Sequence, residues 1–486
     1  MNDNSSKQPI MMAMGDSLSQ GCRSLSVTSR FCAQSYAANI ARALGWDYVT
    51  ANYPKPVLFD LENTLSGVDG FLLVGEAPFI LQSIGNNSDF WASPTAEWAS
   101  TETNAHDCVG ITGAVLDDLI TFDSNHYDGV IKSMAGRGAL DLLETGDLSK
   151  LHIAITGRYA LNPSNNPEFA NLTQLGWVNR RKPKYLFVDS GHNSSDSGFF
   201  GTVFSGNPPV SPANPNGTGF NRSNYIANMT KLVDALLTLE KMPDQIFISL
   251  LPKPSAVPNM EPNWVPLKDI PYFDRYWPAF GVSNNEITGP AMQAIDESVL
   301  EANKQVASYI SSKDTGNHFT VIDSYALLAK YDYKHAQYGL CPGIQIPVGG
   351  LNIDNNYVEG TADTSVQAPR GITIFKFLRG GFSSLDGCHP TAIGYAIYAL
   401  EMLETMAARI GTPVLSTAQR QAIVTTALNN EDLVKPNMLR QVEMIRQYLN
   451  AFSSHKNPQA TTSGANASTV AQVVEGTKEV FVARAA

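Results

Sequence analysis

The sequence has few charged residues and no long apolar run. Charged residues make up 16% of the 486 positions, and hydrophobic residues make up 43%. An average soluble domain has roughly 25% charged residues. No stretch reaches the roughly 18 apolar residues of a transmembrane helix, so we expect no stable insertion into a membrane. The composition predicts a globular chain with enough apolar material for a sizeable core.

The sequence also lacks a basic cluster and a secretion signal. The net charge is −11, and an acidic chain without clustered Lys and Arg is a poor candidate for binding nucleic acid. The first nine residues are polar and contain no apolar signal-peptide segment. This favours a cytoplasmic location, with a secreted or periplasmic one left open if a leader has been removed. The oligomeric state stays open.

Cysteine is scarce. The five cysteines form no Cys-x-x-Cys pair, and their number is odd, which excludes a disulfide scaffold and the common zinc frameworks. A single bridge between Cys22 and Cys32 remains an open alternative. No metal site is expected.

Short apolar runs alternate with segments of helical periodicity along the chain. The first run ends at Gly15, and it is followed by a predicted helix over 31–44 and a predicted strand over 47–51. The later predicted strands cover 184–189, 245–250 and 319–323, and the later predicted helices cover 224–239, 288–311 and 391–410. This alternation predicts an α/β fold with about five parallel strands.

Long segments separate these elements. Four of them, rich in Pro, Gly, Asn and Ser, follow expected carboxyl ends of strands: 54–105, 195–222, 252–287 and 329–385. A further insertion, 123–183, contains a strand-like run at 151–155. Because ligands bind at the carboxyl edge of an open α/β sheet, we expect the insertions to wall one site.

Two parts of the chain are predicted. Residues 1–411 form one domain with insertions at about 54–105, 123–183, 252–287 and 329–385. Residues 412–486 form an extension that is helical to 452, with a Ser/Asn/Thr-rich linker at 453–468 and a terminal strand or hairpin at 470–483.

The residue pattern with the clearest chemistry starts at the end of the first strand. Gly15, Asp16, Ser17 and Leu18 follow that strand, so Ser17 is expected at the carboxyl edge of the sheet. A serine hydroxyl needs an adjacent base to act as a nucleophile. Asp386 and His389 are three residues apart, so the carboxylate can hold one imidazole nitrogen while the other faces Ser17.

With these blocks, the chain resembles the GDSL or SGNH serine esterases and lipases. The segments Gly110–Ala114 and Ser190–Asn193 are similar to the family's two middle blocks, with Ser194 where the family usually has Asp. The resemblance implies a three-layer α/β/α, flavodoxin-like fold and a Ser17–His389–Asp386 triad. It also implies an oxyanion hole formed by the Ser17 and Gly113 N–H groups and the Asn193 side chain, with no metal or organic cofactor.

The aromatic residues of the insertions favour a hydrophobic ester such as a lipid or lysophospholipid. Within 252–287, we expect Trp264, Tyr272 and Trp277 to contact the substrate. Three alternatives stay open: an acyltransferase using the same acyl-enzyme, a carbohydrate acetylesterase, and a catalytically idle binding module.

Overall fold

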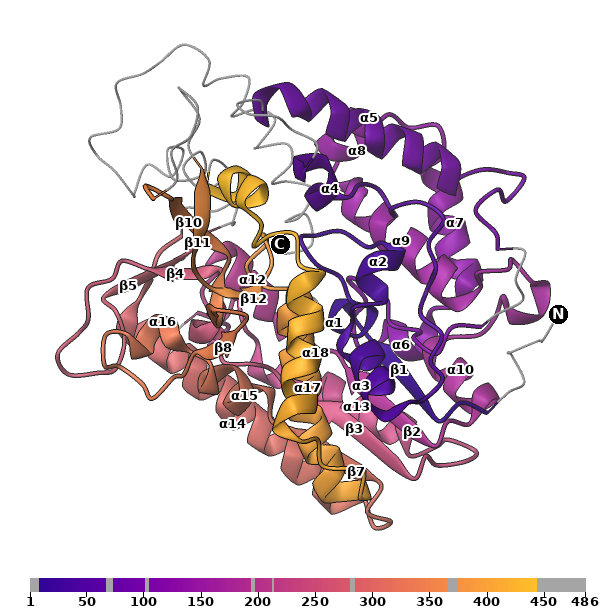
Figure 1. Cartoon of the computed structure of the whole chain (residues 1–486). Coiled ribbons are helices and arrows are strands. Elements are labelled where there is room, and N and C mark those ends of the chain that lie inside the picture. The colour runs from indigo at the N-terminus through magenta and orange to yellow at the C-terminus, as the bar shows by residue number, and fades with distance from the viewer. Residues whose placement is uncertain are drawn as a thin grey trace.

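The computed structural model describes residues 8–66, 73–100, 105–193, 197–211, 214–279, 285–365 and 374–443. Its centre is a four-stranded parallel sheet in the order β1-β2-β3-β7 (Figure 1). The strands are β1 (Met11–Gly15), β2 (Tyr185–Asp189), β3 (Gln245–Ser249) and β7 (Phe319–Ile322). The mixed α/β class and these four parallel strands are confirmed.

The prediction of a strand over 47–51 is wrong. The free edge of β1 is occupied by residues 107–111, since Ala13 N–H donates to Asp107 O (2.9 Å) and Val109 N–H donates to Ala13 O (2.9 Å). The backbone N–H of Val49 instead donates a hydrogen bond to the side-chain Oδ2 of Asp107 (2.6 Å). A short apolar run therefore lies beside the sheet without joining it.

Helices pack against the sheet from the segments between the strands. Helices α3 and α17 contact each other, and the Tyr398 hydroxyl on α17 donates to Asp189 Oδ2 on β2 (3.0 Å). Helices α13 and α14 also pack together, and α14 contacts β7. Their bounds are α3 (Tyr36–Leu44), α13 (Arg222–Leu236), α14 (Gly289–Lys313) and α17 (Ala392–Ile410). The predicted helices over 224–239, 288–311 and 391–410 are confirmed, whereas the one over 31–44 is split into α2 (Ser29–Cys32) and α3.

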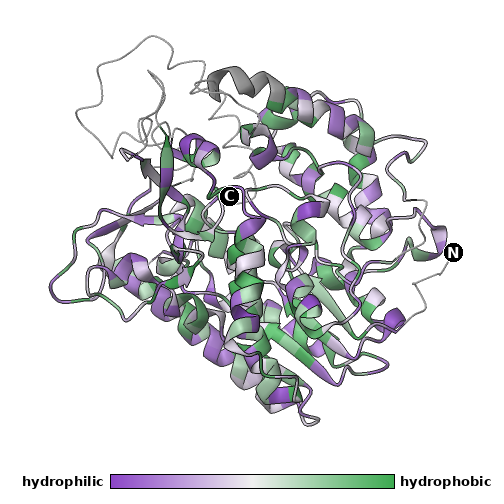
Figure 2. Cartoon of the chain, in the orientation of Figure 1, coloured by the Kyte–Doolittle hydropathy of each residue, from purple (hydrophilic) through white to green (hydrophobic). Residues whose placement is uncertain are grey.

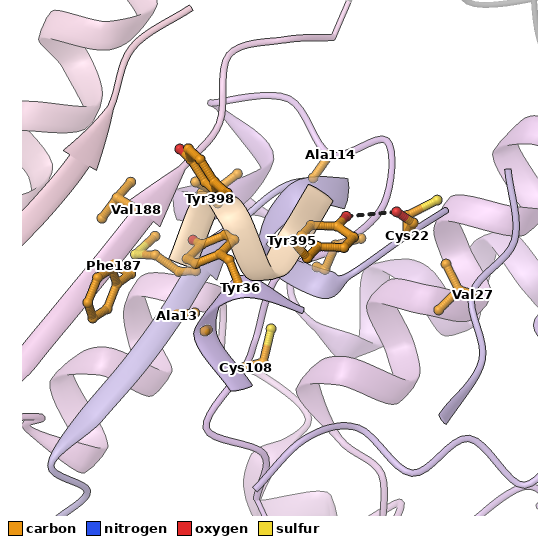
Figure 3. Packing of buried hydrophobic residues seen from close by; sticks show 14 of the residues in the cluster. Ala13, Cys22, Val27, Tyr36, Cys108, Ala114, Phe187, Val188, Tyr395 and Tyr398 are labelled. Carbon is orange, nitrogen blue, oxygen red and sulfur yellow. Dashed lines mark hydrogen bonds between the residues drawn. The ribbon is translucent and has the colours of Figure 1, made fainter. Parts of the chain in front are cut away.

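The core lies on both sides of the central strands, which explains their continuous apolar sequences. Met11, Met12 and Met14 are fully buried, and the Phe187 and Phe247 rings stack at 4.9 Å. The strands carry hydrophobic colouring along their length (Figure 2). Figure 3 shows how this core joins distant segments: the Tyr395 hydroxyl on α17 donates to the Cys22 carbonyl (2.7 Å).

The insertion 123–183 is helical where the sequence predicts a strand-like run. Residues 151–155 belong to α9 (Asp147–Leu161), most of whose side chains are buried. A helix buried on nearly all sides shows no amphipathic period, so its apolar run cannot be distinguished from a strand by pattern. Other helices described before β2 are α1 (Ser17–Gln20), α4 (Leu61–Ser66), α5 (Leu73–Trp91), α6 (Asp118–Thr121), α7 (Ser124–Met134), α8 (Ala139–Glu144) and α10 (Gln174–Arg181).

The later insertions form small sheets and short helices at the carboxyl side of the central strands. One sheet has the order β4-β5-β6, a second has the order β12-β9-β8, and β10 pairs with β11. The strands are β4 (Met260–Pro262), β5 (Arg275–Pro278), β6 (Ile287–Thr288), β8 (Ile346–Val348), β9 (Leu351–Tyr357), β10 (Glu359–Ala362), β11 (Phe375–Arg379) and β12 (Gly381–Ser383). The short helices are α12 (Phe199–Ser205), α15 (Ser324–Lys330) and α16 (Tyr333–Ala336).

The C-terminal extension begins by packing on the main core. Helix α18 (Thr417–Asn429) lies along α17, and its Val424 and Ala427 are buried in the main core (Figure 1). The linker predicted at 453–468 and the strand predicted at 470–483 lie outside the described residues. None of the helices in the described ranges is long and apolar enough to cross a membrane.

Candidate active site

Ser17 stands where β1 turns sharply into α1. Gly15 ends the strand with φ +133°, and a Cβ there would lie 1.9 Å from the Asp189 carbonyl oxygen. Only glycine allows β1 to approach the end of β2 this closely. Asp16 caps α1 by accepting a hydrogen bond from Leu18 N–H (3.2 Å), and Ser17 is the first residue of the helix. The turn therefore presents the Ser17 hydroxyl at the carboxyl edge of the sheet.

The structure brings Ser17, His389 and Asp386 together in one hydrogen-bonded chain. His389 Nε2 is 2.9 Å from Ser17 Oγ, and His389 Nδ1 is 2.9 Å from Asp386 Oδ2. His389 and Asp386 lie in the turn that precedes α17, and all three side chains are largely buried. The order hydroxyl, imidazole, carboxylate is the one needed to move a proton from the serine to the histidine.

Asp386 is held as a carboxylate. It accepts hydrogen bonds from the backbone N–H groups of Leu25 (2.9 Å), Cys388 (2.9 Å) and His389 (2.8 Å). Burial alone would raise the pKa of Asp386, but the adjacent His389 and these hydrogen bonds outweigh it and keep the pKa below the usual value. An ionised Asp386 can stabilise positive charge on His389.

Two further loops meet the Ser17 turn. Thr112 N–H donates to Gln20 Oε1 on α1 (2.9 Å), and Asn193 Nδ2 donates to the Ala114 carbonyl (2.6 Å). Among the described residues, no backbone carbonyl outside the helices and strands accepts a hydrogen bond from Ser17 N–H or Gly113 N–H. An amide NH₂ has two protons, so the bond to Ala114 leaves Asn193 one donor. Gly113 and Asn193 therefore lie on adjoining loops, which is the placement that the predicted oxyanion hole requires.

Gly113 offers a direct test of this arrangement. Its φ is +82°, and a Cβ would lie 2.6 Å from Ile153 Cγ1 on α9. Gly113→Ala should therefore displace the backbone N–H, and we expect kcat for an ester substrate to fall about 10²- to 10³-fold, as when one oxyanion donor is lost. Steady-state kinetics measures this change.

A matched control separates the displaced N–H from backbone strain. Gly136 has a similar φ of +78°, but a Cβ added there would have no atom within 4 Å. Gly136→Ala should cost about 1 kcal/mol of stability and leave kcat unchanged. Equal loss of kcat in both variants would contradict the role of the Gly113 N–H.

A second histidine lies beside the nucleophile turn. His192 Nδ1 is 2.9 Å from Asp16 Oδ2, and His192 Nε2 is 3.9 Å from Asp189 Oδ1. The contact with Asp16 shows that His192 holds the residue before Ser17, which is a structural role. Burial raises the pKa of Asp189 to about 6, assisted by the nearby Asp16 carboxylate. The buried end of β2 thus carries a carboxyl group that resists ionisation.

This shift predicts a pH effect on stability. The unfolded pKa of an Asp is about 3.9, so between about pH 4 and pH 6 the folded chain binds more protons at Asp189 than the unfolded chain. Stability from this group is therefore lost as pH rises through that window and stays low above it. The variant Asp189→Asn cannot ionise at this position, so it should not show this loss of stability between pH 4 and pH 6. The free energy of unfolding of the variant, minus that of the wild type, should increase by about 2 kcal/mol from pH 4 to pH 7 in urea titrations. A pH-independent difference would contradict this.

A mainly apolar pocket opens next to His389. Its described lining comes from seven segments of the chain: Leu18, His192, Phe199, Phe200, Pro252, Val257, Pro258, Ser324, Leu327, Leu328, Phe382, Ser383, Cys388, His389, Pro390 and Tyr398. The segment 252–287 contributes Pro252, Val257 and Pro258 to this lining.

The three aromatic residues expected to contact the substrate are not in this lining. The Tyr272 hydroxyl donates to the buried Asp296 (2.9 Å), and the Trp264 ring packs on Phe273 at 5.6 Å. Trp277 lies on β5 opposite Glu261. Tyr272 is buried in the main hydrophobic core and Trp264 packs against that core. Contact of the three aromatic residues with a substrate stays a prediction that nothing in this pocket supports.

Sequence reasoning missed two further neighbours of the site. His152, on α9, has its pKa lowered to about 4 by burial and by the proximity of His389. Phe200, on α12, places its ring centroid 6.2 Å from that of His389. Both come from insertions whose approach to the site depends on tertiary packing, for which the sequence carries no local signal.

The described side chains show other features of the site. They contain no cluster of three or more His, Cys, Asp or Glu residues arranged to hold a metal ion. All five cysteines are free thiols, so the bridge between Cys22 and Cys32 that the sequence left open is not formed.

Comparisons with protein-family models, with characterised proteins and with solved structures found no match.

Proposed function

We propose that the protein is a serine hydrolase of carboxylic esters. The observation that carries the proposal is the chain Ser17 Oγ–His389 Nε2 (2.9 Å) and His389 Nδ1–Asp386 Oδ2 (2.9 Å), beside an apolar pocket. A structural serine needs neither an imidazole partner nor a buried carboxylate behind that imidazole. A serine nucleophile that works through a Ser-His-Asp triad uses both.

The proposed reaction has two halves. Ser17 Oγ attacks the ester carbonyl carbon while its proton passes to His389 Nε2. The tetrahedral intermediate collapses, the bond to the alcohol oxygen breaks, and His389 returns the proton to that oxygen. Water then attacks the acyl-enzyme with His389 as base, which releases the carboxylic acid and restores the Ser17 hydroxyl. Asp386 holds His389 in the required tautomer and stabilises the imidazolium.

The negative charge on the carbonyl oxygen needs donors. In the proposal these are the N–H groups of Ser17 and Gly113 and the second proton of Asn193 Nδ2. One such donor is typically worth about 2.7–4 kcal/mol of transition-state stabilisation. The support is the convergence of the loops: Ile111 N–H donates to Gly15 O (3.0 Å), and Asn193 bonds to Ala114.

The resemblance to the GDSL or SGNH esterases is part of this proposal. The four sequence blocks that carry the resemblance contribute Ser17, Gly113, Asn193 and the pair Asp386 and His389. The α/β class with a central parallel sheet is compatible with the three-layer, flavodoxin-like arrangement of that family. Both the family and the finer fold remain proposals.

Covalent labelling tests the proposal. A fluorophosphonate probe should label the wild-type protein at Ser17, because the probe reacts with serines activated by a base. The His389→Ala variant should be labelled far more slowly, although it retains the serine. Peptide mapping by mass spectrometry identifies the modified residue. A folded wild-type protein that shows no labelling would exclude the proposed nucleophile.

A further inference from the structure

The position of the pocket beside His389 indicates which part of an ester it can hold, the acyl group or the alcohol group. Among the described residues its lining includes His389, its neighbours Cys388 and Pro390, and Leu18, but neither Gly113 nor Asn193. The carbonyl oxygen must lie at the oxyanion donors. The alcohol oxygen must lie within hydrogen-bond reach of His389 Nε2, from which it takes its proton. The group attached to the alcohol oxygen therefore extends past the imidazole into this pocket.

The lining also sets the chemical character of that group. The walls are formed by side chains such as Phe200, Val257, Leu327, Leu328 and Phe382, and the described lining contains no Asp, Glu, Lys or Arg. The Tyr398 hydroxyl is already engaged with Asp189 and Ser249. A charged alcohol would lose its hydration without gaining a counter-charge, which is unfavourable. The pocket suits an uncharged alkyl group.

The size of the pocket limits the length of that alkyl group. Its cavity volume is about 70 Å³. An apolar cavity of about 150 Å³ is the size that admits benzene, with six carbon atoms. The pocket therefore has room for about three or four carbon atoms. A longer chain must leave through the mouth and gains little further burial.

We infer that the pocket binds the alcohol moiety of the substrate, and that this moiety is a short, uncharged alkyl group of about three or four carbons. The inference rests on the proposed ester hydrolysis and narrows it. It disfavours lysophospholipids, whose leaving groups are large and charged. The acyl chain then lies on the other side of Ser17, away from this pocket.

Isomeric esters separate the two sides of the bond. Propyl acetate and methyl butanoate have the same atoms, as do butyl acetate and methyl pentanoate, but the long chain is on the alcohol in the first of each pair. Acid release in a pH-stat should give kcat/KM rising about fourfold per methylene from methyl to propyl or butyl acetate, then levelling off. The methyl alkanoates should show no such rise. A rise on the acyl side alone, or on neither side, would overturn the inference.

A charged analogue tests the character of the pocket. Acetylcholine is an acetate whose alcohol carries a quaternary ammonium group. Its kcat/KM should be at least about tenfold below that of butyl acetate. A preference for acetylcholine would overturn the assignment.

A pair of variants tests whether the alcohol group of the substrate lies in this pocket. Leu328→Ala enlarges the pocket wall on α15 and should shift the preferred alcohol by one or two carbons towards pentyl or hexyl acetate. Leu400→Ala is the matched control, because Leu400 is similarly buried (6% exposed against 8% for Leu328) but does not line the pocket. It should leave the preference unchanged. Phe382→Leu, a smaller change in the part of the lining that β12 provides, replaces Leu328→Ala if that variant does not fold.

The outcome can be read separately from the proposed function. Fluorophosphonate labelling of Ser17 reports on the nucleophile whatever the ester preference. Labelling without the predicted alcohol preference would refute only the pocket assignment. No labelling and no ester hydrolysis would refute the function itself.

Discussion

Ser17→Ala should lower kcat for ester hydrolysis by about 10⁴-fold or more, as when a triad serine is removed from other hydrolases. The variant keeps the pocket and the oxyanion donors, so substrate still binds. It lacks the oxygen that His389 Nε2 contacts at 2.9 Å, so no acyl-enzyme can form. The methyl group of alanine fits the same helix position, so the fold should be retained.

The control for this experiment is another helix-starting serine. Ser29 begins α2 and donates its hydroxyl to the Tyr53 carbonyl (2.7 Å). Ser29→Ala removes a comparable hydroxyl without touching His389, so its kcat should stay close to that of the wild type. Circular dichroism and thermal unfolding verify that both variants are folded. A folded Ser17→Ala protein with near-normal turnover would exclude Ser17 as the nucleophile.

The residues that the sequence could locate share one property. The central strands β1, β2 and β3 are short runs buried on both faces, whereas β7 is partly buried at the edge of the sheet. Each of the four lies where the sequence predicts it. The carboxyl ends of parallel strands meet at one edge. A motif after β1 and another after β2 are therefore expected to lie close together on the strength of the strand pattern alone.

What the sequence could not provide depends on long-range packing. Residues 47–51 have a strand-like pattern, but residues 107–111 take the position beside β1. Half of the pocket's described lining residues come from α12, α15 and the loop at 252–258, none of which carries a motif. Trp264 and Tyr272 are the kind of bulky side chain that lines apolar sites, but an aromatic ring is as well suited to an insertion's own core as to a binding wall.

The second large effect that we expect concerns stability rather than chemistry. Arg23 is fully buried behind the Ser17 turn, and its Nε donates to Glu62 Oε1 (2.8 Å) while its Nη2 donates to Glu431 Oε1 (2.8 Å). Both carboxylates are also buried. Arg23→Met would leave two carboxylates in the core without this cation. Removing one partner of a buried ion pair typically costs about 3–5 kcal/mol, so we expect a loss of that size in the free energy of unfolding.

The position of Arg23 links this loss to the site. The next two residues, Ser24 and Leu25, have positive φ values of 49° and 58°, a conformation that is unfavourable for non-glycine residues. Their N–H groups donate to Ser384 Oγ (2.8 Å) and Asp386 Oδ2 (2.9 Å). The ion pairs of Arg23 hold this strained turn in place. Weakening them should therefore also loosen Asp386 and lower kcat.

Glu431 extends the same network into the C-terminal extension. Its Oε2 accepts a hydrogen bond from the N–H of Ala392 (2.9 Å), which is the first residue of α17 and lies three positions after His389. Burial raises the pKa of Glu431, with the nearby Glu62 carboxylate adding to the effect and Arg23 opposing it. Without Arg23 this pKa should rise further. A raised carboxyl pKa means that stability falls as pH rises, so the loss in Arg23→Met should be larger at pH 8 than at pH 5.

Urea unfolding of four proteins measures this network: the wild type, Arg23→Met, Glu431→Gln and the double variant. The double variant should be less destabilised than the sum of the single losses, because neutral glutamine removes one of the uncompensated charges. Arg222→Met is the surface control, since Arg222 pairs with Glu301 (3.4 Å) in a largely exposed ion pair and its loss should cost no more than about 1 kcal/mol. If Arg23→Met were no more destabilised than Arg222→Met, the C-terminal extension would not be held to the Ser17 turn by these charges.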